Sequence, residues 1–92
     1  MKTTQLTLLR ETRVPFAGGY WSGYLLAAGD AFIVRSITRW DSGAHYTHAD
    51  ERFAARDEAL RALEHETLHA EHYDGAQAPR VVWDNTNAQK GT

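Results

Sequence analysis

Hydrophobic side chains in the first half of the chain fall into three segments separated by glycine and proline. These segments, residues 4–14, 20–28 and 31–40, are rich in threonine, aromatic or aliphatic side chains. Such side chains are typical of strands. Pro15 and the Gly18-Gly19 pair predict the end of the first strand and a turn. Gly29-Asp30 is a tight-turn pair, so the second and third strands are predicted to form a β-hairpin.

The next segment, residues 45–53, fits two local structures. Tyr46 and Thr47 are strand formers, whereas Thr47 and Asp50 have the spacing of a capping box at a helix start. We expect a strand, because the acidic pair Asp57-Glu58, which is typical of a first helical turn, comes later in the chain.

One amphipathic helix is predicted over residues 56–73. The segment is dense in Ala, Leu, Glu and Arg and lacks glycine and proline, while Gly75 and Pro79 follow it as stop signals. At about 100° per residue, one broad face collects mainly apolar side chains: Phe53, Ala55, Ala59, Leu60, Ala62, Leu63, Thr67 and Ala70. The opposite face collects Glu58, Arg61, His65, His69 and His72.

A helix with one apolar face needs one apolar sheet face to cover it. With a short final strand at residues 80–83, the chain is predicted to be a small two-layer α+β domain. An antiparallel sheet of four to five strands packs against the one helix. Residues 1–84 are assigned to this domain and residues 85–92 to a flexible tail. The second face of the sheet lacks a cover, although the strand over residues 31–40 has apolar side chains on both sides.

Composition narrows the class of protein. The 92 residues are 42% hydrophobic and 24% charged, which is typical of a globular domain. There is no cysteine for a disulfide or a thiolate metal site. No apolar stretch approaches the roughly 20 residues of a membrane span, and no signal peptide is evident. We therefore expect a cytoplasmic protein without a cofactor and without membrane contact.

The net charge of −2 is unevenly distributed. From Asp57 to Asp74 six acidic side chains stand against Arg61 alone, whereas residues 1–56 are slightly basic. Such a distribution predicts two electrostatically different surfaces. The acidic side chains proposed to contact a partner are Glu58, Glu64, Glu71 and Asp74. Their charges resemble a phosphate track and could occupy a basic groove that normally holds nucleic acid. The simpler interpretation is a solvated helix face.

The uncovered sheet face is a second candidate for binding. Arg35 and Arg39 lie two pleats apart, and aromatic side chains such as Trp21 or Tyr24 are expected nearby. Basic groups beside stacking rings can bind single-stranded nucleic acid. Alternatively, the arginine stems simply cover apolar surface. The negative net charge disfavours nucleic acid, because its affinity depends largely on neutralising phosphates.

The pentapeptide His65-Glu66-Thr67-Leu68-His69 matches the H-E-x-x-H pattern of zinc metalloproteases. Histidines at i and i+4 stack on one helix face to bind Zn²⁺, and the glutamate polarises the bound water. A zinc hydrolase would take His65, His69 and His72 as ligands. However, the histidines lie opposite the apolar helix face, and a small chain leaves little material for an enclosed cleft. We expect solvated histidines and no metal.

In size and element order, a cysteine-free antiparallel sheet with one acidic helix and a polar tail resembles several small phage-borne anti-CRISPR proteins. The resemblance covers the whole chain and rests on no motif, so no functional residue is carried over. It implies stoichiometric binding to a subunit of a bacterial CRISPR effector complex, which obstructs recognition of target DNA. We expect such an inhibitor rather than an enzyme. A nucleic-acid-binding sheet module and, less favoured, a zinc metallohydrolase through HETLH are the alternatives.

Overall fold

The computed structural model describes residues 5–85 and consists of one sheet and one helix. Three long strands, β1 (Leu6–Phe16), β2 (Gly19–Ala28) and β3 (Ala31–Trp40), form a meander. Two three-residue strands, β4 (His45–Thr47) and β5 (Glu51–Phe53), follow. The helix α1 (Arg56–Ala70) and the strand β6 (Arg80–Asp84) complete the fold. The two-layer α+β class predicted from the sequence is confirmed. The predicted count of four to five strands is wrong, because the sheet formed by the described residues has six strands and residues 45–53 supply two of them.

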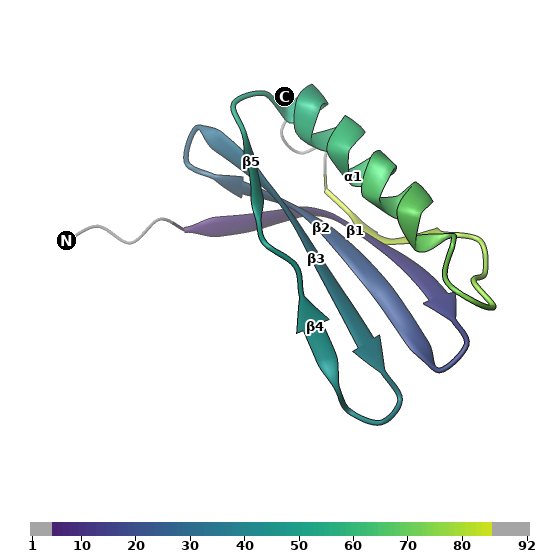
Figure 1. The fold of residues 1–92 in the computed structure, drawn as a ribbon. Helices are drawn as coiled ribbons and strands as arrows, with labels where there is room; N and C mark the ends of the chain where they lie inside the picture. Colours follow the sequence, from purple (N-terminus) through teal and green to yellow (C-terminus); the bar gives the residue numbers. More distant parts are fainter. Residues whose placement is uncertain (1–4, 86–92) are drawn as a thin grey trace.

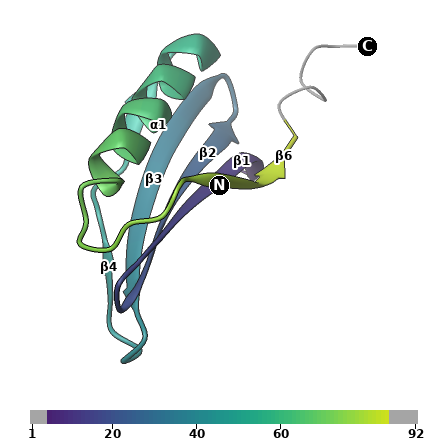
Figure 2. The same cartoon turned by 90° about the vertical axis from the view of Figure 1, so that its right-hand side faces the viewer.

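All strand pairs are antiparallel, and the sheet order is β4-β3-β2-β1-β6, with β5 also paired to β3. The chain therefore crosses from one edge of the sheet to the other through α1. The helix lies diagonally over one face of the sheet (Figure 1). In the side view α1 lies on one side of the sheet, and no helix of the described residues covers the other side (Figure 2). No helix within residues 5–85 is long and apolar enough to cross a membrane.

The core lies between α1 and the facing side of the sheet. Ala59, Leu63 and Ala70 are the buried residues of the helix, in agreement with the predicted apolar face. They pack against buried side chains of the three long strands, namely Leu9, Val14, Trp21, Leu25 and Val34. A second, smaller cluster of Leu26, Ala28 and Ile33 lies on the opposite side of the sheet. Apolar positions on both sides of β2 and β3 thus supply two clusters of unequal size.

Gly23 makes room for the largest core side chain. It faces α1, and a Cβ atom built on it would collide with the Trp21 ring and with Leu63. The indole of Trp21 therefore occupies the space beside Gly23, and Trp21 is only 3% exposed. The prediction that Trp21 lies near Arg35 and Arg39 on the uncovered sheet face is wrong. Because side chains alternate along a strand, Tyr20, Ser22 and Tyr24 point to the sheet face opposite α1, whereas Trp21 points toward the helix.

The first strand continues past the predicted stop at Pro15. Pro15 pairs with Tyr20, and Phe16 pairs with Gly19 to close a two-residue hairpin loop. In such a hairpin the closing pair is hydrogen bonded and the next pair is not, so the Pro15 nitrogen faces away from β2. The missing N–H therefore costs no bond in the β1–β2 ladder.

The helix ends at Ala70, three residues before the predicted end. The backbone N–H groups of His72 and Tyr73 donate to the carbonyls three residues earlier, which tightens the chain into a turn. The Tyr73 ring lies 4.7 Å from the Phe16 ring, and its hydroxyl is 3.3 Å from Thr38 Oγ1. These contacts with β1 and β3 pull Tyr73 out of the helical path.

Residues 45–53 are strand, as favoured from the sequence, but the strand is interrupted. β4 and β5 both pair with β3, and the chain between them leaves the ladder. The His48 N–H still donates to the Ser36 carbonyl at 2.9 Å. The predicted tail over residues 85–92 lies outside the described residues except for Asn85, whose N–H donates to the Leu9 carbonyl.

Candidate functional site

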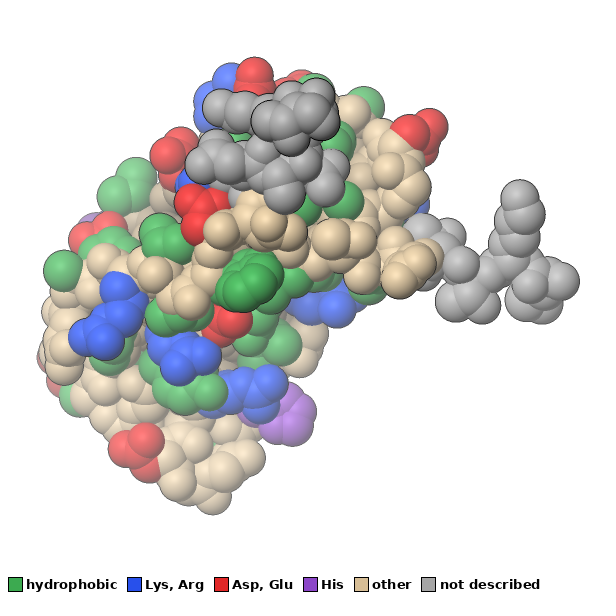
Figure 3. Space-filling model, turned by 180° about the vertical axis from the view of Figure 1, so that it is seen from behind, with side chains coloured by type: hydrophobic (Ala, Val, Ile, Leu, Met, Phe, Trp, Pro, Cys, Tyr) green, Lys and Arg blue, Asp and Glu red, His purple; other side chains and the backbone are tan. Residues whose placement is uncertain are grey.

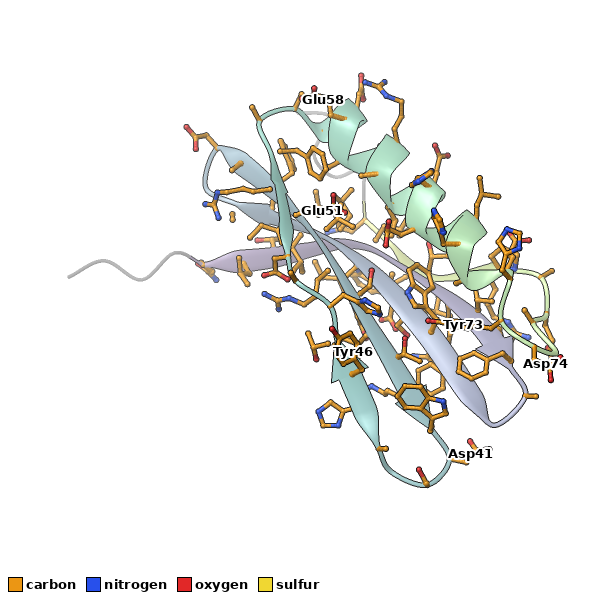
Figure 4. The ribbon with its side chains drawn as sticks, in the orientation of Figure 1. Asp41, Tyr46, Glu51, Glu58, Tyr73 and Asp74 are labelled. Carbon is orange, nitrogen blue, oxygen red and sulfur yellow. The ribbon has the colours of Figure 1, made fainter. Side chains whose placement is uncertain are left out.

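The four acidic residues predicted to contact a partner are all exposed, but they do not form one surface. Glu58 lies at the beginning of α1 and Asp74 lies in the turn beyond its end (Figure 4). Glu64 and Glu71 are seven residues apart and therefore share a helix side. The structure thus brings two of the four carboxylates together.

Glu64 and Glu71 border a groove of about 480 Å³ between α1 and the strands β1 and β6. Its apolar lining comes from Leu63 and Leu68 on the helix and from Pro79 and Val81 on the other wall. The remaining lining residues are Arg10, Thr12 and Thr67. The Thr67 hydroxyl donates to the Leu63 carbonyl at 2.7 Å, so its methyl group is left to contact the groove.

Large apolar side chains on both walls of the groove are exposed. Leu68 is 61% exposed and Val81 is 54% exposed. Neither residue was proposed for binding from the sequence. Leu68 lies outside the apolar stripe of the helix, among charged residues, and an apolar side chain in such a position is the signal that could have identified it.

β6 forms the free edge of the sheet beside this groove, and all five of its residues are exposed. It pairs with β1 through an irregular register between Glu11 and Thr12. Arg10 Nη2 lies 3.3 Å from Asp84 Oδ2, and the Trp83 indole N–H donates to the Leu8 carbonyl. These side-chain contacts hold a short strand that contributes little to the core.

Arg35 and Arg39, the two predicted sheet residues, both lie on the face opposite α1. The Arg35 guanidinium donates two hydrogen bonds to Asp50, at 3.0 and 2.9 Å. These bonds lower the pKa of the Asp50 carboxyl and raise the pKa of Arg35. The side chain of Arg39 is exposed and makes no hydrogen bond or ion pair with any residue from 5 to 85.

The histidines of the HETLH motif lie on the exposed side of α1, as expected. His65 Nε2 and His69 Nε2 are 3.1 Å apart, with the rings edge to face. His72 does not complete a metal site with His65 and His69. In the described part of the chain, no three His, Cys, Asp or Glu side chains are grouped so that they could hold a metal ion. The ligand set required by the hydrolase alternative is therefore not assembled.

A second hollow of about 440 Å³ lies near the end of α1 and is lined by Trp21, His48, Glu66, His69, Ala70 and Tyr73. Thr38 Oγ1 stands between the Tyr73 hydroxyl at 3.3 Å and His48 Nε2 at 3.5 Å. These polar contacts connect the end of the helix with β3 and with the chain after β4. Their evident role is to fix that corner of the fold.

Comparisons with protein-family models, with curated proteins and with solved structures find no match to this chain. The functional argument therefore depends on the surfaces themselves.

Proposed function

We propose that this protein is a non-catalytic inhibitor that binds a partner protein through the groove between α1 and β6. The observation that carries the proposal is the pair of exposed apolar side chains, Leu68 and Val81, on opposite walls of a groove that Glu64 and Glu71 also line. An apolar centre with a charged rim is the common anatomy of a protein–protein interface.

The charges of the groove favour a basic partner. Glu64 and Glu71 make no ion pair with any residue between 5 and 85, so both carboxylates are available to a partner. Arg10 at the base of the groove is already paired with Asp84. Opposite charges across an interface accelerate encounter and select the partner, while the apolar centre supplies affinity.

A basic protein surface that accepts carboxylates often serves to bind nucleic acid, so occupying it would block that binding. The resemblance to anti-CRISPR proteins makes a subunit of a bacterial CRISPR effector complex the first partner to test. On this proposal the protein acts in the cytoplasm of the bacterial host and obstructs recognition of target DNA.

The test combines purified effector complexes with variants of the groove. Leu68→Asp should lower affinity at least tenfold, because it puts a charge into the apolar centre, and Glu64→Lys/Glu71→Lys should do the same through like-charge repulsion. Leu68 is exposed, so Leu68→Asp should fold normally, which circular dichroism can verify. The matched control is Glu58→Lys, which changes an exposed carboxylate of the same helix outside the groove. Equal binding by wild type and both groove variants would contradict the proposal.

A further inference from the structure

The sheet face opposite α1, termed the open face here, presents five arginines from four strands. Strand register places them on one side of the sheet together with half-buried tyrosines. The arginines are Arg13 on β1, Arg35 and Arg39 on β3, Arg52 on β5 and Arg80 on β6. Seen from behind, basic side chains lie among hydrophobic ones on the visible face, with a few acidic side chains between them (Figure 3).

The open face is positive although the chain has a net charge of −2. Two of the arginines are neutralised, since Arg13 pairs with Glu11 at 2.9 Å and Arg35 pairs with Asp50. Arg39, Arg52 and Arg80 form no ion pair with the residues that the structure describes. Three guanidinium groups on this side are therefore available for an anionic ligand.

The arginine stems and the rings lie against the sheet. Ser22 is fully buried although no helix covers it, so neighbouring side chains of the open face must shield it. The Arg13 guanidinium carbon lies 4.5 Å from the centre of the Tyr20 ring, a cation–π contact. Tyr24 is half-buried in the next row, and Trp83 at the edge is 50% exposed. Flat rings beside guanidinium groups provide surfaces on which bases can stack.

The charge distribution argues against a second copy of this chain as the occupant. A twofold contact through the open face would bring two positively charged surfaces together, because the carboxylates of Glu11 and Asp50 are already paired with Arg13 and Arg35. An anionic ligand with flat rings satisfies both the charges and the aromatic side chains. Single-stranded nucleic acid has both properties, because its phosphates are charged and its bases are unpaired.

From this combination we propose that the open face binds single-stranded nucleic acid without sequence preference. Arg39, Arg52 and Arg80 contact phosphates, and Tyr24 and Trp83 stack on bases. The site lies on the opposite side of the sheet from the groove and does not depend on the proposed inhibitor function.

Fluorescence anisotropy with a labelled oligo-dT of roughly 16 nucleotides tests the proposal at low salt. Arg39→Glu/Arg80→Glu should lower affinity at least tenfold and make the salt dependence less steep, because two phosphate contacts are lost. Trp83→Ala should lower affinity about fivefold or more through the lost stacking. Arg61→Glu is the matched control, because it reverses an exposed charge on α1, and it should change affinity by less than about twofold.

Three results would overturn the assignment. One is no anisotropy change for the wild type with either oligo-dT or oligo-U. Another is an equal loss of affinity in Arg61→Glu, which would show only a general response to net charge. The third is competition by poly-glutamate as effective as that by unlabelled oligonucleotide, which would identify the open face as a surface for acidic proteins. Thermal unfolding of each variant verifies that the fold is retained.

Discussion

At the scale of single residues, Gly23 and Trp21 show how much of the core depends on one missing side chain. The Trp21 ring and Leu63 occupy the space above Gly23, where a Cβ atom would have to lie. A glycine in a strand interior often marks either a β-bulge or the close approach of other groups. The actual reason is the close approach of the Trp21 and Leu63 side chains, which alternation within one strand does not reveal.

Gly23→Ala should lower the free energy of unfolding by about 1–3 kcal/mol, because the added methyl group overpacks this region. Urea unfolding followed by tryptophan fluorescence measures the change. Gly29→Ala lowers stability for a different reason, since Gly29 has a φ of +64° and open space around it. A normal midpoint for Gly23→Ala would mean that Trp21 can move away without loss.

The Arg35–Asp50 pair predicts a small pH dependence. Hydrogen bonds from Arg35 hold the pKa of Asp50 below its ordinary value of 3.8. A lowered pKa in the folded state means that the pair stabilises the fold above about pH 4 and that this contribution is lost as the pH falls through the lowered value. The side chains of Arg35 and Asp50 are 34% and 39% exposed, so solvent screens the pair. Its contribution to the free energy of unfolding is therefore at most about 1 kcal/mol.

Asp50→Asn should therefore unfold at a slightly lower temperature than wild type at pH 7, and the two proteins should converge as the pH falls below the lowered pKa of Asp50. Calorimetry at several pH values measures the difference. A gap that persists or widens in acid would contradict the assigned role of the pair.

At the scale of elements, the helix shows what periodicity can and cannot predict. The 3.6-residue pattern identified Leu63 and Ala59 as buried, and the structure confirms both. It did not predict the end of the helix at Ala70, because the turn is fixed by Tyr73 contacting Phe16 and Thr38, residues distant in sequence. It also gave no reason to connect Leu68 with Val81, since their proximity depends on where β6 joins the sheet.

Leu63→Ala should destabilise the domain by about 2–4 kcal/mol, because Leu63 is 2% exposed and its removal leaves a cavity against the sheet. This is a large share of the stability of a domain of this size. Chemical denaturation gives the value. Leu68→Ala, on the same helix but 61% exposed, is the control and should change stability by less than about 0.5 kcal/mol.

The HETLH motif leads to a separate prediction for α1. Because His65 and His69 are exposed and lack a third ligand in the described part of the chain, the purified protein should contain no stoichiometric zinc. His65→Ala/His69→Ala should keep full partner binding. Elemental analysis and a binding assay test both statements, and a tightly held zinc ion lost together with activity in the double variant would restore the hydrolase interpretation.

At the scale of the whole molecule, the sheet separates two surfaces of opposite charge. The layer order followed from the sequence, because one amphipathic helix can cover only one face of a sheet. The distribution of functional groups on the surfaces did not follow. Arg80 and Val81 are neighbours in sequence, yet they belong to the open face and to the groove, respectively, because β6 alternates between them.

This separation predicts that the two surfaces can be inactivated independently. The groove and the open face lie on opposite sides of the sheet, and at physiological salt a charge is screened over about 8 Å. Glu64→Lys/Glu71→Lys should therefore abolish binding to the basic protein partner while changing oligonucleotide affinity by less than about threefold. Arg39→Glu/Arg80→Glu should have the reverse effect. Both affinities are measured for both variants and for wild type at two salt concentrations. If either variant lowers both affinities equally, one shared surface binds both ligands, and the separation of roles by the sheet is wrong.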